Sequence, residues 1–374
     1  MKLTKEIFRE YDIRGIYNQE FDEEIAYLIG KAYGTKLRSY GKNKTVVAYD
    51  NRLSSPSLEE NLVKGVLETG VDVLRLGLAT TPMCYFAANY YGTDASMMIT
   101  ASHNPKEYNG FKFSYNGIHN AYGESVKEIY EIIEKGEFAS GKGEIINKNI
   151  EEAYINLITK KLTFGSRKIK VVYDCGNGTT SIMWKYLYDK VDNKACLFDV
   201  KCSKSLEDEL IKLGVKPVEY RTGNSYTRAA SAEGDYPLSG ELSGHVYFRD
   251  KFPGYDDGIY AGMRLIELLT HIDKPLSSLL DDVNKYYSTP EMKVKTTDDK
   301  KFLIINKIKE YCENKEYNIL TIDGVKAKFS DGFALVRASN TGPNITMRFE
   351  ATTEKRLEEL KEEFTTELNK YLDK

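Results

Sequence analysis

The segments 100–105, Thr-Ala-Ser-His-Asn-Pro, and 109–112, Asn-Gly-Phe-Lys, hold the residue types best suited to catalysis in this chain. A serine hydroxyl is a weak nucleophile by itself. Once phosphorylated, it can pass its phosphoryl group to a sugar hydroxyl and take another back, provided that cations neutralise the moving charge. This chemistry makes Ser102 the candidate phosphoryl carrier, with His103 and Lys112 as assisting groups. A serine in a polar turn is more often a backbone cap, so the other motifs decide between the two interpretations.

The segment 337–343, Arg-Ala-Ser-Asn-Thr-Gly-Pro, is a candidate site for a phosphate group. Guanidinium, hydroxyl and backbone N–H groups in one tight turn provide convergent donors to a dianion. Two arginines beside a hairpin are usually surface ion pairs, but the Ser-Asn-Thr stretch between them favours a phosphate clamp. The candidate ligands are Arg337, Ser339, Asn340, Thr341 and Arg348.

Alternating elements are predicted to position the serine loop. The first third of the chain shows apolar strand patterns at 45–49, 71–76 and 95–100, separated by a helical pattern at 57–69 and another after Pro82. This βαβαβ order predicts a mostly parallel sheet covered by helices, whose ligand loops follow the carboxyl ends of the strands. The loop of Ser102 directly follows the third of these strands.

A second α/β pattern begins at Ala195 and is followed by an α+β region. The predicted strands are 196–200 and 217–220 and the helices are 205–213 and 255–269. From about Thr289, two helices, 299–314 and 353–372, accompany strands at 318–322, 325–329, 334–336 and 345–349.

The piece between the two α/β patterns is too small to be a domain. It offers a helix over 148–162, a strand over 169–173, the turn 174–178 and a helix that ends near Tyr188. One strand and one helix cannot bury a core alone. The predicted fold class is therefore α/β with mixed or parallel sheets flanked by helices, a truncated second domain and a C-terminal α+β domain, divided at 1–147, 148–192, 193–288 and 289–374.

The composition argues against several classes of partner. The 374 residues include 53 basic and 56 acidic side chains, a formal net charge of −3, so we expect no binding to nucleic acid or an anionic membrane. The five cysteines are widely spaced and lack a Cys-x-x-Cys pair, which indicates reduced thiols. No signal peptide or long apolar run is seen, so we expect a cytoplasmic protein.

Taken in order, these motifs resemble the α-D-phosphohexomutases, the phosphomannomutase and phosphoglucomutase family. The loop 100–105 with the downstream segment 108–112 resembles the family's phosphoserine loop. The segment 11–15, Tyr-Asp-Ile-Arg-Gly, resembles an N-terminal stretch that reaches the active site, which implies that Tyr11 and Arg14 contact substrate or phosphoserine. Asp50 and Arg52 fit the Asp-x-Arg that ends the following strand.

The same resemblance gives a role to the segment 240–245, Gly-Glu-Leu-Ser-Gly-His. Alone, it would be a Gly-rich hairpin turn with a solvated Glu241. It resembles the family's sugar-recognition loop, and the following segment 254–260 matches as well. The resemblance implies that Glu241 and Ser243 bind sugar hydroxyls, that His245 is a general acid or base, and that Lys201 is a cation near the substrate.

The resemblance implies both an activity and an architecture. The four predicted segments would be a phosphoserine-loop domain, a remnant of the metal-binding domain, a sugar-loop domain and a phosphate-binding domain. The implied activity interconverts hexose 1-phosphate and hexose 6-phosphate, of glucose or mannose, through phosphoserine and a bisphosphate, with hexose bisphosphate as activator. The alternative is a weakly active or inactive homologue that binds phosphosugars.

The chain departs from the family at the metal site. The family supplies an Asp-Gly-Asp-x-Asp-Arg loop for an essential Mg²⁺, whereas this sequence contains no Asp-x-Asp at all. The match stops near Tyr188 and resumes at 198–203, which indicates an internal deletion. Losing about 3–6 kcal/mol of transition-state stabilisation would slow the chemistry by about 10²–10⁴-fold.

Two further consequences follow from the departures. Asn224 stands where the family pattern leads us to expect a histidine, and an amide cannot shuttle protons. The remnant must also bury its apolar faces against a neighbouring domain or another subunit, and a homodimer is one solution.

Overall fold

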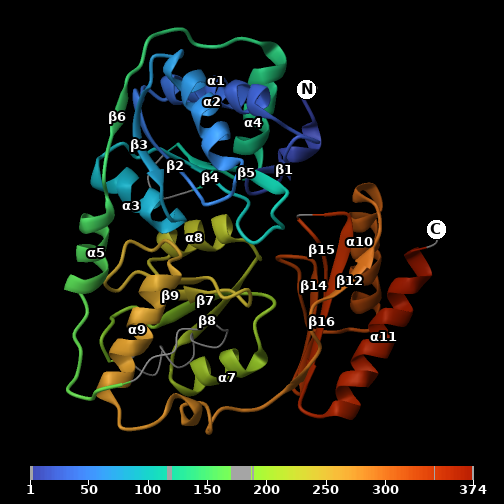
Figure 1. Ribbon diagram of the computed structural model, residues 1–374. Coiled ribbons are helices and arrows are strands. Elements are labelled where there is room, and N and C mark those ends of the chain that lie inside the picture. Colours follow the sequence, from blue (N-terminus) through green and yellow to red (C-terminus); the bar gives the residue numbers. More distant parts are fainter. Residues whose placement is uncertain (1–2, 116–119, 170–186, 188, 341, 373–374) are drawn as a thin grey trace. The chain divides into compact units, whose positions relative to one another are not determined.

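The computed structural model describes residues 3–115, 120–169, 187, 189–340 and 342–372 (Figure 1). The chain divides into two compact units, Met1–Lys161 and Leu162–Lys374, and each is described by itself.

The first unit is built on a six-stranded mixed sheet with the order β1-β5-β4-β2-β3-β6. Strand β2 is parallel to β3 and β4, and β3 is parallel to β6, whereas β5 runs antiparallel to β1 and β4. The strands are β1 Ile13–Ile16, β2 Lys44–Tyr49, β3 Asp72–Leu78, β4 Ser96–Ile99, β5 Tyr108–Ser114 and β6 Ile145–Asn147. The predicted strands at 45–49, 71–76 and 95–100 are confirmed, and β5 is inserted between β1 and β4.

Helices cover this sheet because apolar side chains alternate between its two faces. Val47, Val73 and Met97 belong to the core that the sheet shares with α1, α2 and α4, whereas residues next to them point to the opposite face. Thr80 starts α3, because its hydroxyl accepts a hydrogen bond from the backbone N–H of Met83. The helices are α1 Glu23–Ser39, α2 Ser55–Leu67, α3 Thr81–Tyr90, α4 Glu124–Lys135 and α5 Glu151–Lys160, after the 3-10 turn η1 Lys5–Ile7.

The second unit begins with a four-stranded sheet of order β10-β9-β7-β8. Strand β7 is parallel to both β8 and β9, and β9 and β10 form an antiparallel hairpin. The elements are β7 Ala195–Asp199, α7 Lys204–Lys212, β8 Lys216–Tyr220, α8 Asn224–Glu233, β9 Leu238–Gly240, β10 Val246–Phe248 and α9 Gly258–His271. Helix α9 begins three residues after the predicted start, because Asp257 caps it by accepting from the N–H of Tyr260.

The C-terminal part of this unit is an antiparallel sheet with two helices on one face. Its order is β11-β16-β15-β14-β13, with β12 also paired to β16. Met347, Phe349 and other apolar residues pack against α10 and α11. The elements are η2 Leu276–Ser278, β11 Tyr287–Ser288, β12 Met292–Lys295, α10 Asp298–Asn314, β13 Ile319–Leu320, β14 Val325–Phe329, β15 Gly332–Ala338, β16 Asn344–Ala351 and α11 Glu354–Leu372.

The piece between the two α/β patterns is described only in part. The predicted helix over 148–162 is present as α5, Glu151–Lys160. The predicted strand at 169–173, apart from Ile169, the turn 174–178 and nearly all of the helix that follows lie outside the described residues. The predicted domain limits stay a prediction. None of the helices described has the length and apolar character needed to cross a membrane.

Candidate functional site

The serine loop occupies the carboxyl edge of the first sheet, as its sequence position predicts. Ser102 follows β4 and has a left-handed backbone, with φ of 56°. Its N–H donates to Thr100 Oγ1 over 2.9 Å, and its exposed Oγ lies 3.3 Å from His103 Nδ1. The hydroxyl is therefore presented to solvent beside an imidazole that can exchange a proton with it.

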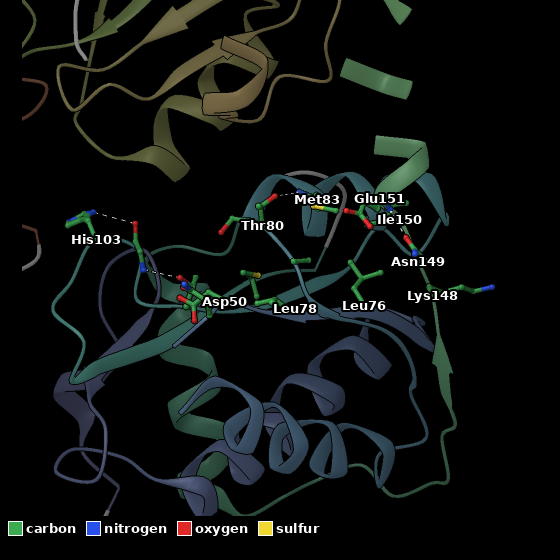
Figure 2. A pocket seen from close by; sticks show the side chains of 16 residues that line it. Asp50, Leu76, Leu78, Thr80, Met83, His103, Lys148, Asn149, Ile150 and Glu151 are labelled. Carbon is green, nitrogen blue, oxygen red and sulfur yellow. Dashed lines mark hydrogen bonds between the residues drawn. The ribbon is translucent and has the colours of Figure 1, made fainter. Parts of the chain in front are cut away.

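A groove of about 750 Å³ begins at Ser102 and His103 and follows this edge of the sheet (Figure 2). This volume lies within the range typical of small-molecule sites. Polar side chains, among them Asp50 and Thr80, alternate with apolar ones such as Leu78 along its lining.

A buried carboxylate links two of the predicted cationic groups. Asp12 pairs with Arg14, and Lys112 Nζ lies 3.3 Å from Asp12 Oδ2. Arg14 also donates to Asn104 Oδ1 over 3.0 Å, which ties it to the serine loop. Burial opposes ionisation of Asp12, but the charges of Lys112 and Arg14 outweigh it and hold the pKa of Asp12 below its usual range.

Pairing of β1 with β5 sets Arg14 opposite Gly110, and Lys112 comes two residues later on β5. The antiparallel insertion of β5 is thus what brings the N-terminal segment beside the serine loop. Asp12 was not singled out from the sequence, because its importance depends on this pairing. Tyr11, half-buried, lies two residues before the start of β1.

The predicted sugar loop is the turn of the β9–β10 hairpin, so the segment 240–245 is a hairpin turn as well as the predicted loop. Glu241 is buried, in contrast to the solvated position expected of an ordinary turn. Thr227 Oγ1 donates to Glu241 Oε1 over 2.6 Å, and Ser243 Oγ donates to Oε2 over 3.2 Å. Burial, followed by the negative charge of Asp199, raises the pKa of Glu241 against the opposing effect of His245.

His245 is oriented by groups from two other elements. Its Nδ1 lies 2.9 Å from Asp256 Oδ2 and 3.4 Å from Asn224 Nδ2 at the start of α8. Burial alone would raise the pKa of Asp256, but the hydrogen bond and charge of His245 outweigh it and lower that pKa strongly. The ionised carboxylate of Asp256 therefore binds Nδ1 of His245 and keeps the imidazole ring in one orientation.

Lys201 lies at the same end of this unit's first sheet. Its Nζ is 2.7 Å from Glu291 and 3.8 Å from Asp199. Asp199 also accepts from the backbone N–H of Leu242 over 3.1 Å, which connects the lysine to the sugar loop.

The predicted phosphate clamp is the turn between β15 and β16. Ser339 N–H donates to the Asn344 carbonyl over 2.8 Å and closes this turn. Lys301 from α10, which was not singled out from the sequence, is buried and donates to the carbonyl of Ser339 over 2.9 Å. Asn340 lies in the turn, and Thr341 lies outside the described residues.

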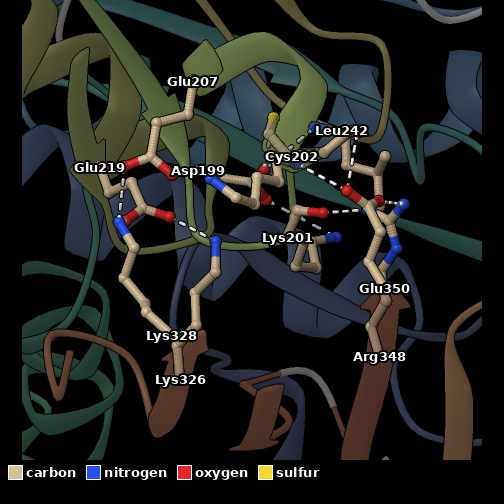
Figure 3. Close-up of polar contacts among 12 residues, drawn as sticks. Asp199, Lys201, Cys202, Glu207, Glu219, Leu242, Lys326, Lys328, Arg348 and Glu350 are labelled. Atoms are coloured by element: carbon tan, nitrogen blue, oxygen red, sulfur yellow. Dashed lines mark hydrogen bonds and ion pairs between the residues drawn. The ribbon is translucent and has the colours of Figure 1, made fainter. Parts of the chain in front are cut away.

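The two arginines of the clamp lie on one face of the strand pair but bind different partners. Arg337 Nε donates to Asp323 Oδ2 over 3.0 Å. Arg348 instead donates to the Lys201 carbonyl and, over 3.2 Å, to Glu350, as Figure 3 shows. A phosphate at this turn would compete with these carboxylates for the guanidinium groups.

The described residues do not form a magnesium site. Among them, no three His, Cys, Asp or Glu side chains come together in a group that could hold a metal ion. Two acidic side chains of the predicted site, Asp12 and Asp323, are instead paired with arginines. No step proposed below is assigned to the ion.

Comparisons with known proteins cover nearly the whole chain. Residues 5–140, 175–286 and 291–367 match the family models for phosphoglucomutase/phosphomannomutase alpha/beta/alpha domain I, alpha/beta/alpha domain III and the C-terminal domain. A phosphomannomutase/phosphoglucomutase of Pseudomonas aeruginosa is 32% identical, over 98% of this chain and 96% of that protein. A phosphoglucomutase of Neisseria gonorrhoeae is 30% identical, over 97% of this chain and 96% of that protein.

A solved structure agrees with these sequence matches. The crystal structure of a phosphoglucomutase/phosphomannomutase family protein from Burkholderia thailandensis is similar with a TM-score of 0.86 and 28% identity, covering 99% of this chain and 98% of that one. The matches in sequence and in fold therefore agree, and the chain belongs to the phosphoglucomutase/phosphomannomutase family, the α-D-phosphohexomutases.

Proposed function

We propose that this protein is a phosphohexomutase that interconverts the 1-phosphate and 6-phosphate of glucose or mannose. The observation that carries the proposal is the exposed Ser102 Oγ, held in a left-handed turn beside His103 at the head of a groove. The family relatives named above support the same reaction.

The proposed reaction moves one phosphoryl group out and another back. Phosphorylated Ser102 transfers its phosphoryl group to the free 1- or 6-hydroxyl of the hexose phosphate, and the hydroxyl proton leaves to a base. The resulting bisphosphate turns round, and its other phosphoryl group passes to Ser102 Oγ, which releases the isomeric monophosphate. Lys112 and Arg14 neutralise the transferring charge, because both are cations held near the serine loop.

The residues of the second unit would hold the part of the substrate that does not react. Glu241 and Ser243 bind vicinal sugar hydroxyls, and Lys201 contributes a positive charge beside them. His245 serves as general acid or base through Nε2, since Nδ1 is the nitrogen that faces Asp256. The phosphate that is not transferred binds to Arg337, Ser339, Asn340, Thr341 and Arg348.

Three finer points belong to the same proposal. A shortened second domain is supported by the absent Asp-x-Asp and by the Pseudomonas alignment, which runs over 446 positions for a chain of 374 residues. A homodimer would cover the shortened segment, and light scattering on the purified protein decides this point. We also propose a cytoplasmic location and activation by hexose bisphosphate, in keeping with the phosphohexomutase family.

The proposal is tested by Ser102→Ala. We expect mutase turnover, primed with hexose 1,6-bisphosphate, to fall by at least about 10³-fold, because the phosphoryl acceptor is gone. Intact mass should show one phosphoryl group on the wild type and none on the variant. The control is Ser39→Ala at the exposed end of α1, which should keep both. Equal turnover in the wild type and Ser102→Ala would refute the proposal.

A further inference from the structure

Arg52, in the loop between β2 and α2, binds the serine loop through its backbone. Its Nη1 donates to the carbonyls of Pro105 over 2.7 Å and Tyr108 over 2.9 Å. Its Nη2 donates to the carbonyls of Ser102 over 3.1 Å and Asn104 over 2.7 Å. We propose that Arg52 is a positioning residue that sets the geometry of Ser102 for phosphoryl transfer. This inference builds on the mutase activity proposed above.

The hydrogen bonds that Arg52 donates favour a role in positioning the loop over a role in binding phosphate. A guanidinium has five N–H donors in a fixed planar fork. Four of them point to the loop carbonyls, and the fifth, on Nε, donates to Asp50 Oδ2 over 3.2 Å. All five donors are therefore used within the protein. Arg52 can reach a phosphate only by releasing the loop, so its contribution to catalysis passes through the loop.

The conformation of Ser102 explains why the loop needs such support. A φ of 56° is unfavourable for a residue with a Cβ, and such strain persists only where the surroundings determine the backbone. Local contacts provide part of the support, since Ser102 N–H donates to Thr100 Oγ1 and Asn104 N–H donates to the Ala101 carbonyl. Arg52 adds a charged side-chain donor to the carbonyl of Ser102 itself.

Arg52 is in turn held by a polar network that begins at Asp50. Asp50 Oδ1 accepts from the N–H of Arg52 over 3.1 Å and from Ser55 Oγ over 2.6 Å. Buried Asn109 on β5 donates to Ser55 Oγ over 2.9 Å. This chain of contacts connects the end of β2, the start of α2 and β5 to the serine loop, so a shift in any of them reaches Ser102 through the guanidinium.

Two substitutions separate geometry from charge. Arg52→Gln removes both the fork and the charge, whereas Arg52→Lys keeps the charge but offers only three donors on one nitrogen. If Arg52 acts by positioning, both variants should lower kcat by about 10–100-fold with KM within about twofold of wild type, since a small misplacement of the nucleophile is this costly. Phosphorylation of Ser102 by hexose 1,6-bisphosphate should also be slower in both variants, to the same extent as kcat. Intact mass of samples that are quenched rapidly measures this rate.

The control is Arg75→Gln, on the same sheet. Arg75 pairs with buried Glu59, and among the described residues no hydrogen bond or ion pair joins its side chain to the serine loop. Its loss should reduce thermal stability while leaving kcat within about threefold of wild type. Recovery of kcat in Arg52→Lys, or a raised KM with unchanged kcat in Arg52→Gln, would overturn the positioning role, because these results indicate a charge or substrate contact.

A second measurement does not depend on turnover. Hydrogen exchange of the backbone amides of residues 100–108 should become faster in Arg52→Gln and Arg52→Lys than in Arg75→Gln, because the loop has lost its support. Unchanged exchange in this segment would also overturn the inference. If the wild type shows neither turnover nor phosphorylation, the mutase proposal fails, and the exchange experiment still decides whether Arg52 holds the loop.

Discussion

Glu241 is a buried carboxylate whose ionisation is opposed by its burial more than it is favoured by its neighbours. Thr227, Ser243 and Tyr247 all donate to it, but burial still raises its pKa. A group whose pKa is raised by folding stabilises the protein fully below its unfolded pKa, and this contribution is lost as the pH rises through the folded pKa. Ionisation of Glu241 therefore costs stability in the folded protein, and the ionised carboxylate is a strong acceptor for sugar hydroxyls.

We predict that Glu241→Gln raises the melting temperature at pH 7 and weakens the mutase. The amide removes the buried charge, so the increase in melting temperature over wild type should become smaller as the pH falls from 7 to 5. Loss of a charged acceptor should lower kcat/KM by about 10–100-fold. Thermal melts over this pH range and steady-state assays at pH 7 check both expectations.

Glu219→Gln is the matched control, because its carboxylate is also buried. Burial opposes its ionisation, but Lys326 and Lys328 outweigh this effect and lower the pKa of Glu219. Its stabilising contribution is present above its unfolded pKa and lost as the pH falls through the lower folded pKa. This variant should melt lower than wild type at pH 7, and the same direction in both variants would contradict the explanation.

At the scale of an element, the phosphate hairpin depends on the helix that packs beneath it. Lys301, in the first turn of α10, donates to the carbonyls of Ser339 and, at 3.5 Å, Gly342. It also pairs with Asp298 over 2.6 Å. These contacts hold the turn between β15 and β16 in a shape that can present backbone N–H groups to a phosphate.

We predict that Lys301→Met weakens binding of hexose phosphate by about tenfold and lowers stability by about 1–3 kcal/mol. We expect both losses because the carbonyls of the turn would no longer have a charged hydrogen-bond donor. Calorimetric titration with glucose 6-phosphate measures the affinity. Lys307→Met, on the exposed face of the same helix, is the control and should match wild type, because Lys307 makes an exposed ion pair with Glu310. Equal affinity of both variants would show that the hairpin does not need Lys301.

At the scale of the molecule, buried and partly buried ion pairs connect the C-terminal sheet with β8 and α7 of the second unit (Figure 3). Lys326 on β14 pairs with Glu219 on β8, and Lys328 lies 2.7 Å from both Glu219 and Glu207. Ser203 Oγ donates to Glu350 over 2.8 Å. The antiparallel sheet thus turns a charged face toward β7 and β8, and helices cover its apolar face.

We predict that Lys326→Met destabilises the protein by about 1–3 kcal/mol and separates the melting of 195–272 from that of 289–374. Removing one partner leaves the buried Glu219 carboxylate poorly compensated, which costs more than the original pair contributes. Differential scanning calorimetry should show a lower, broader transition. Lys361→Met removes an exposed pair with Glu358 and should change stability by less than about 0.5 kcal/mol. A single sharp transition at the wild-type temperature would contradict this prediction.

The elements that the sequence predicted well are those with a strong local signal. Strand β14, Val325–Phe329, has the predicted bounds, and α10 differs from its predicted start by one residue. Helix α8 and the strands β9 and β10 were not predicted, although a hairpin turn was considered for 240–245, because α8 is rich in small polar residues and three-residue strands show little periodicity. The site loops were found from motifs, which are also local.

The sequence alone indicates the family, the α/β alternation of the first third and the position of Ser102 after a strand, because periodicity, turn residues and motifs act over short distances. Only the tertiary structure decided that β5 lies between β1 and β4, that Asp12 joins Arg14 to Lys112, and that Arg348 faces Glu350. These contacts depend on the register of strands and on which charges are buried together. No single segment contains that information, since it is set by packing between residues far apart in the chain.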